Sequence, residues 1–180
     1  ALMNLNVSLR QSLLRHDRKF SDELRWQLFT VEVTPERSFT TVDKNTFRNT
    51  WQRELLDASA EGLIPREHLL DACLASLARD FAAYRAGWFS LMYAALKPTA
   101  AESAQRQDTL VNLLGSPVGT TVTLAVKQLS AVHRAGLLDA DRFVRGCAPA
   151  LLTSKANALA ILKPLASLRG TVGDTPDAEA

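Results

Sequence analysis

Apolar side chains recur every three or four residues along most of this chain, which is the spacing of one face of an α-helix. Phe47, Trp51, Leu55 and Ala58 form the clearest stripe, and Gly62 follows it as a stop signal. Similar stripes, bounded by proline, glycine or a capping residue, predict helices over residues 6–16, 21–29, 45–61, 65–81, 88–96, 99–114, 116–133, 139–151 and 154–169. The pattern predicts an all-α fold.

Part of this pattern occurs twice, with a constant offset of 74 residues. The first set is Gly62, Leu63, Ile64, Leu69, Leu70, Cys73 and Leu77, and the second is Gly136, Leu137, Leu138, Phe143, Val144, Cys147 and Leu151. Each set reads as the end of one helix and the start of the next, so Gly62 and Gly136 are expected in left-handed backbone conformation just past a helix. An offset of 74 corresponds to two hairpins of roughly 37 residues, near the period of HEAT repeats. We therefore expect a right-handed HEAT/ARM-like α-solenoid of stacked antiparallel helical hairpins.

The expected organisation has three parts. Residues 1–44 form an N-terminal helical segment and a loop, over 31–44, that packs on the repeats. Residues 45–170 form the HEAT-like repeats, and residues 171–180 form a disordered tail or linker. Two prolines, Pro149 and Pro164, are expected to kink or break the last helices. Thr99 and Glu102 have the spacing of a capping box at a helix start.

Composition limits the class of protein and the compartment that the sequence predicts. Of the 180 residues, 47% are hydrophobic and 22% are charged, as in ordinary soluble proteins. No apolar run approaches the roughly 20 residues of a membrane span, and the N-terminus does not resemble a signal peptide. Because the chain opens without methionine, we interpret it as a fragment of a longer protein. Cys73 and Cys147 occupy equivalent repeat positions, too far apart for a disulfide, which favours buried thiols in a reducing compartment.

Charge is spread unevenly along the chain. Residues 1–108 carry 14 basic and 14 acidic side chains, whereas residues 109–170 carry seven basic and two acidic ones. The mildly basic C-terminal half could attract an acidic partner, but its charge density is well below that of a nucleic-acid-binding surface.

Several segments resemble an uncharacterised family of long bacterial proteins built largely of HEAT-like helical repeats, known only as a domain of unknown function. The segments are Trp51, 62–66, 69–71, 77–81, 85–89, and 96–99 with Glu102. The resemblance spans residues 22–170 and is most specific around 62–102. It implies an α-solenoid fold and a cytoplasmic, bacterial setting, and it brings no established activity or catalytic residue.

No catalytic or cofactor motif stands out in the sequence. His16, His68 and His133 lie on separate predicted helices without the companions of a metal-binding helix, and His68 with Asp71 reads as a surface pair. There is no Cys-x-x-Cys, nucleophile elbow, P-loop or dinucleotide glycine pattern. We expect no enzyme activity and no cofactor.

Two clusters are candidates for binding a partner. Residues 79–89 combine arginines with aromatics, which dominate interface hot spots, and the candidates there are Arg79, Asp80, Arg85 and Trp88. The alternative is that these side chains fill the core and set a hairpin angle, and burial of Trp88 would favour it. Arg142 and Arg145 form the second candidate, a cationic patch, for which an ordinary solvated helix face is the alternative.

Together these observations predict a non-catalytic protein-binding scaffold or adaptor segment of a larger bacterial protein. Its partner is expected to be a protein rather than a membrane. The alternative is a nucleic-acid-binding HEAT-like module that uses the basic C-terminal half. An enzyme would need catalytic groups from elsewhere in the parent protein.

Overall fold

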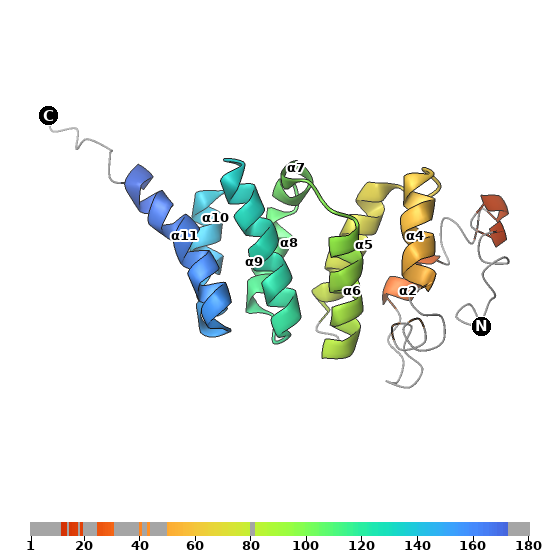
Figure 1. Cartoon of the computed structure of the whole chain (residues 1–180), viewed down its shortest axis with the longest axis horizontal. Coiled ribbons are helices and arrows are strands. Elements are labelled where there is room, and N and C mark those ends of the chain that lie inside the picture. The colour runs from red at the N-terminus through yellow and green to blue at the C-terminus, as the bar shows by residue number, and fades with distance from the viewer. Residues whose placement is uncertain are drawn as a thin grey trace, which may run out of the picture. The chain divides into compact units, whose positions relative to one another are not determined.

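A computed structural model describes residues 12, 13, 15–17, 19, 25–30, 40, 43, 50–79 and 82–172. All regular structure within these residues is helical, as predicted (Figure 1). The α-helices are α2 (Arg25–Thr30), α4 (Thr50–Ala60), α5 (Arg66–Leu77), α6 (Ala83–Ala95), α7 (Ala100–Ala104), α8 (Gln107–Asn112), α9 (Gly119–Arg134), α10 (Ala140–Gly146) and α11 (Lys155–Val172), with 3-10 turns η4 (Leu113–Gly115) and η5 (Ala148–Leu152). The chain divides into two units, unit 1 (Ala1–Pro98) and unit 2 (Thr99–Ala180), and this division falls inside the expected repeat region.

Unit 1 is built around α5, which packs on α6, α4 and α2. Its buried side chains come from the predicted stripes and include Trp51, Leu55, Leu69, Leu70, Cys73, Leu74, Leu77, Phe89 and Met92. Arg66 donates from Nη2 to the carbonyl oxygen of Leu96 at 2.8 Å, so the start of α5 binds the end of α6. This bond satisfies a carbonyl that lacks a partner within its own helix.

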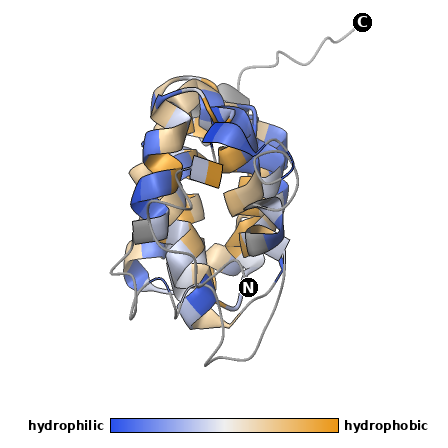
Figure 2. Cartoon of the chain, turned by 90° about the vertical axis from the view of Figure 1, so that its right-hand side faces the viewer, coloured by the Kyte–Doolittle hydropathy of each residue, from blue (hydrophilic) through white to orange (hydrophobic). Residues whose placement is uncertain are grey.

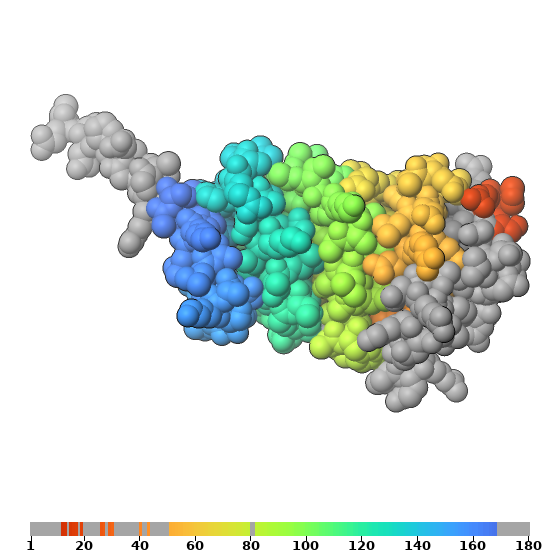
Figure 3. Space-filling view, in the orientation of Figure 1, coloured from red at the N-terminus to blue at the C-terminus, as the bar shows by residue number. Residues whose placement is uncertain are grey.

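Unit 2 has α9 at its centre, in contact with α7, α8, η4 and α11. Its core includes Leu110, Leu113, Val122, Ala125, Leu129, Val132, Phe143 and Ile161. Figure 2, which views the chain from the side of α2 and α4 in unit 1, shows hydrophilic and hydrophobic residues side by side along the helices. One side of α11, drawn in blue, lies open on the face shown in Figure 3.

The two predicted joints have the same geometry. Gly62 and Gly136 have φ angles of 75° and 71° and lie two residues after the last residue of α4 and of α9. The amide of Leu63 donates to the Ala58 carbonyl at 2.9 Å, and the amide of Leu137 donates to the Val132 carbonyl at 3.1 Å. Each glycine amide also bonds the carbonyl three residues back, which completes a Schellman motif. The predicted left-handed glycines are confirmed at both sites.

The 74-residue offset also relates the helix boundaries at the two joints, although the helices themselves differ in length. Helices α4 and α9 end at equivalent positions, and α5 and α10 begin at equivalent positions. The segment equivalent to α6 lies within α11. The order of helices α4–α6 in unit 1 is thus matched by α9–α11 in unit 2, and we call this three-helix segment the repeated element.

The start of unit 2 differs from the predicted helices. The single helix expected over 99–114 is wrong, because it is divided into α7, α8 and η4. The Gln107 side chain donates from Nε2 to the Ala104 carbonyl at 3.1 Å, which satisfies an acceptor at the end of α7. The Thr99–Glu102 capping box is present as predicted.

The two prolines have different effects. Helix α10, which is equivalent to α5, ends at Gly146, and Pro149 lies in the 3-10 turn η5 that follows. Because proline has no amide hydrogen to donate, it does not continue the α-helical hydrogen bonds. Pro164 does not end α11, which continues to Val172 and so includes the first two residues of the predicted tail. The rest of the tail lies outside the described residues.

The N-terminal part is described only at some positions. Thr40 and Asp43 are helical and buried, so the prediction of a loop over 31–44 is wrong at these two residues. The burial of Asp43 depends on a residue outside this segment, because its carboxylate accepts a hydrogen bond from the Trp51 amide at 2.9 Å, in the first turn of α4. In the predicted helix over 6–16, residues 12, 13, 15 and 16 are described and helical. The rest of that helix, and the rest of the predicted loop, lie outside the described residues. None of the described helices is long and apolar enough to cross a membrane.

Candidate functional site

A groove of about 340 Å³ lies between α2 and α5 in unit 1. We call it the α2/α5 groove, and its lining residues are Trp26, Phe29, Thr30, His68, Asp71, Ala72, Ala75, Ser76 and Arg79. Ala72 and Ala75 lie on the same face of α5, because they are three residues apart on the helix. Their side chains are small, and this leaves the space of the groove. Its volume falls in the range of concave binding sites in proteins.

Side chains of α5 hold the end of α2 beside it. Ser76, which is buried, donates from Oγ to the Phe29 carbonyl at 2.8 Å. Arg79 donates from Nη1 to the Thr30 carbonyl at 3.2 Å. Both acceptors belong to the last turn of α2, where carbonyls lack partners within the helix and cations are favoured. These bonds position the Trp26 side of α2 against α5.

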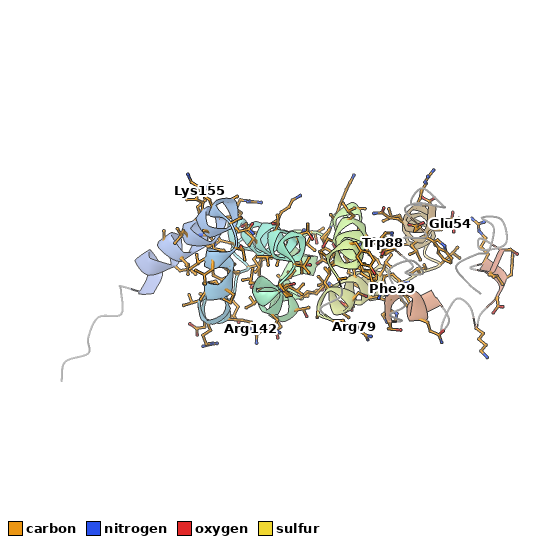
Figure 4. All side chains as sticks on the ribbon, turned by 90° about the horizontal axis from the view of Figure 1, so that it is seen from below. Phe29, Glu54, Arg79, Trp88, Arg142 and Lys155 are labelled. Carbon is orange, nitrogen blue, oxygen red and sulfur yellow. The ribbon has the colours of Figure 1, made fainter. Side chains whose placement is uncertain are left out.

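The groove is apolar at its base and charged at its border. The Trp26 ring meets the His68 ring edge to face, with centroids 5.8 Å apart. Asp71 and Arg79 are exposed at the border, and Arg79 points outward (Figure 4). The apolar base suits a large apolar side chain of a bound molecule. The acidic and the basic group at the border suit polar groups beside that side chain.

Behind the groove lies a buried polar pair, Asp43 and Trp88. Trp88 is 5% exposed, and its indole Nε1 donates to Asp43 Oδ2 at 2.9 Å. The Trp88 ring also packs against Phe29, with centroids 6.3 Å apart. Arg85 is 1% exposed. Two of the predicted partner-binding side chains, Arg85 and Trp88, therefore belong to the core of unit 1, which is the alternative that the sequence left open.

The other predicted residues are spread over the two units. Arg79 is exposed and borders the α2/α5 groove, and Asp80 lies outside the described residues. In unit 2, Arg142 forms an ion pair with Asp108, while Arg145 is exposed. Because a neighbouring carboxylate offsets the charge of Arg142, the predicted cationic patch is weaker than the sequence suggested.

Sequence reasoning missed the role of Trp26. The predicted stripe of the 21–29 segment was Leu24, Leu28 and Phe29, and Trp26 lies off that stripe. A large aromatic on the polar side of a short helix was the available signal. His68 and Asp71, predicted as a surface pair, both line the groove.

The two thiols are buried and free. Burial raises the pKa of the Cys73 thiol far above its usual range. Burial also raises the pKa of Cys147, although its backbone hydrogen bond acts in the opposite direction. At both cysteines burial therefore disfavours the thiolate, which is the nucleophilic form. Within the described part of the chain, no group of three His, Cys, Asp or Glu side chains gathers to hold a metal.

A family match covers residues 8–158, most of the chain, under the description "Domain of unknown function (DUF6493)". The chain belongs to this family. No curated protein and no solved structure matches this chain. The uncharacterised family expected from the sequence is confirmed, and this family assigns no role to any side chain of the α2/α5 groove.

Proposed function

We propose that this chain is a non-catalytic protein-binding scaffold or adaptor, in which helical hairpins stack as in a HEAT-like solenoid. The repeated three-helix element and its two matching Schellman joints support the stacking part of the proposal. A bacterial, cytoplasmic setting belongs to the same proposal and rests on the family resemblance alone.

The α2/α5 groove is the observation that supports protein binding. It combines a partly exposed tryptophan, Trp26, with an exposed arginine, Arg79, and both residue types are enriched at interface hot spots. The alanines at its base leave room for an apolar anchor side chain. The charged border supplies orientation through Asp71 and Arg79, as a polar rim does in protein interfaces.

The test uses a substitution that fills the groove. Ala75→Arg places a long side chain at the exposed base, and Ala94→Arg on α6 is the matched control, because Ala94 is exposed and lies outside the groove. The tagged full chain and both variants are used as bait in cell extract, and each captured protein is purified and measured by titration calorimetry. We expect Ala75→Arg to lower the affinity at least tenfold and Ala94→Arg to leave it unchanged. Equal affinity for all three baits would exclude the groove.

Nucleic-acid binding is the alternative function, and it is tested with the same chain and the Ala75→Arg variant. A nucleic-acid groove would bind duplex or single-stranded DNA at physiological salt, with an affinity that falls steeply as the salt concentration rises. Arg142→Gln and Arg145→Gln would then lower the affinity gradually for every sequence offered. Such salt-dependent binding, without loss in Ala75→Arg, would replace our proposal.

A further inference from the structure

The outward face of α11 carries leucines that no described neighbour covers fully. Leu159 is 52% exposed and Leu162 is 49% exposed, whereas Ile161, on the side that faces α9, is buried. Lys155 and Ala166 are exposed as well. Along α11 the four residues follow one another in the order Lys155, Leu159, Leu162 and Ala166, at spacings of four, three and four. This is the a/d spacing by which one helix packs along another. We call these residues, together with Lys163, the α11 stripe.

The equivalent face of α6 is buried. The residues 74 positions before Leu159, Leu162 and Ala166 are Arg85, Trp88 and Met92, and all three are buried in unit 1. The same helix face in the same repeated element is therefore covered in one unit and open in the other.

Unit 1 shows what kind of side chain covers this face. Phe29 of α2 packs on the Trp88 ring, and the Asp43 carboxylate accepts its indole hydrogen. An aromatic group and a carboxylate thus lie together on the face. The residues 74 positions later are Ser103 and Pro117, which have neither an aromatic ring nor a carboxylate.

Charge around the α11 stripe also favours an acidic occupant. Helix α11 contains three basic residues, Lys155, Lys163 and Arg169, and no acidic one. Lys155 and Lys163 are both exposed within the stripe. In an antiparallel pair of two copies these lysines would approach each other, and like charges at an interface are repulsive. A partner with carboxylates would be attracted instead.

We propose that the α11 stripe docks an amphipathic helix of another protein, with large apolar side chains on one face and Asp or Glu along its border. This is the helix-on-helix mode of peptide recognition, in which apolar anchors spaced by three and four residues enter the facing stripe. It extends the proposed protein-binding function to a second surface. The α11 stripe shares no residue with the α2/α5 groove, so either surface can fail alone.

The test uses a defined probe, a fluorescent synthetic peptide of about three heptads with leucine at a and d and glutamate at e and g. Glutamates on both borders keep the peptide monomeric near neutral pH, because they repel each other. A second peptide with lysine at e and g is the charge control. Fluorescence anisotropy with the full chain should show binding of the glutamate peptide that weakens with added salt, and much weaker binding of the lysine peptide.

Variants locate the binding site. Leu159→Ser combined with Leu162→Ser should lower the affinity for the glutamate peptide by about tenfold or more, since two buried leucines are lost from the contact. Leu91→Ser is the matched control, because Leu91 on α6 is 65% exposed and lies outside the stripe. Ala75→Arg should also bind the peptide normally, which separates this inference from the α2/α5 groove.

Four outcomes would overturn the proposal. They are failure of the glutamate peptide to bind, equal binding of the two peptides, equal binding by the double variant and the wild-type chain, and an equal loss in Leu91→Ser. A second copy of this chain could also cover the α11 stripe, and sedimentation of the full chain tests whether it forms such a dimer. A dimer that the double variant abolishes would assign the α11 stripe to self-association instead.

Discussion

The two copies of the repeated element have the same joints but different outer faces. In unit 1 the face of α6 is buried and contains a polar pair, Asp43 and Trp88. In unit 2 the equivalent face of α11 leaves Leu159 and Leu162 half exposed. The backbone pattern therefore does not decide which face is core, because that depends on side chains contributed from outside the repeated element.

The buried side of the first helix is alike in both units. Leu55 and Leu129 are equivalent and buried, and so are Glu54 and Gln128. Gln128 accepts a hydrogen bond from Ser103 at 3.1 Å, which satisfies a polar group in the core. The units thus share a conserved arrangement at α4 and α9 and differ at α6 and α11.

The largest expected effect separates the two outer faces. Trp88→Ala should lower the free energy of unfolding by about 3–5 kcal/mol, because it leaves a large cavity in the core. Leu162→Ala, at the equivalent position of α11, should change it by no more than about 0.5 kcal/mol, as an exposed substitution. Urea unfolding of the two variants measures both values. Similar losses would mean that the α11 face is covered in solution and would break the comparison.

The next effect concerns two glycines inside helices. A Cβ at Gly146 of α10 would collide with Val111 Cγ1, whereas a Cβ at Gly87 of α6 would meet nothing within 4 Å. Gly146→Ala should destabilise the protein by about 1–3 kcal/mol through overpacking. Gly87→Ala should stabilise it by up to about 1 kcal/mol through helix propensity. Thermal melts of the pair give the sign, and a stabilising Gly146→Ala would contradict the close contact of α8 with α10.

The equivalent cysteines offer a pH test. The folded pKa of Cys73 is raised by burial, so its contribution to stability is complete below the unfolded thiol pKa of about 8.5 and is lost as pH rises above it. Between pH 8.5 and 10 the free energy of unfolding of the wild-type chain should fall by about 2 kcal/mol relative to Cys73→Ala. Cys147→Ala should show a difference of the same sign, since its pKa is also raised. Parallel stability curves for Cys73→Ala and the wild type would place this thiol in water.

The smallest effect tests the shared joints. Gly62→Ala and Gly136→Ala should each cost about 1 kcal/mol, because both positions have positive φ angles and nothing near the added Cβ. Equal costs in urea unfolding would support equivalent joints. A cost at only one of them would show that the two units differ at their joints as well as at their faces.

Local rules determined much of this protein. The helix faces of α4, α5 and α9, the capping box at Thr99 and the left-handed Gly62 and Gly136 all follow from periodicity, caps and backbone sterics. These interactions join residues a few positions apart, so the sequence alone reveals them. The repeat offset extended the same reasoning from one unit to the other.

Only the tertiary structure decided which polar and aromatic groups reach the surface. Trp88 was a hot-spot candidate by residue type, yet it is buried against Phe29, and Asp43, 45 positions earlier, accepts its indole hydrogen. The α2/α5 groove likewise depends on a bond from Ser76 to Phe29, 47 positions apart. Burial is set by such distant pairings, and no local spacing encodes them, so the helices could be predicted from the sequence while the candidate site could not.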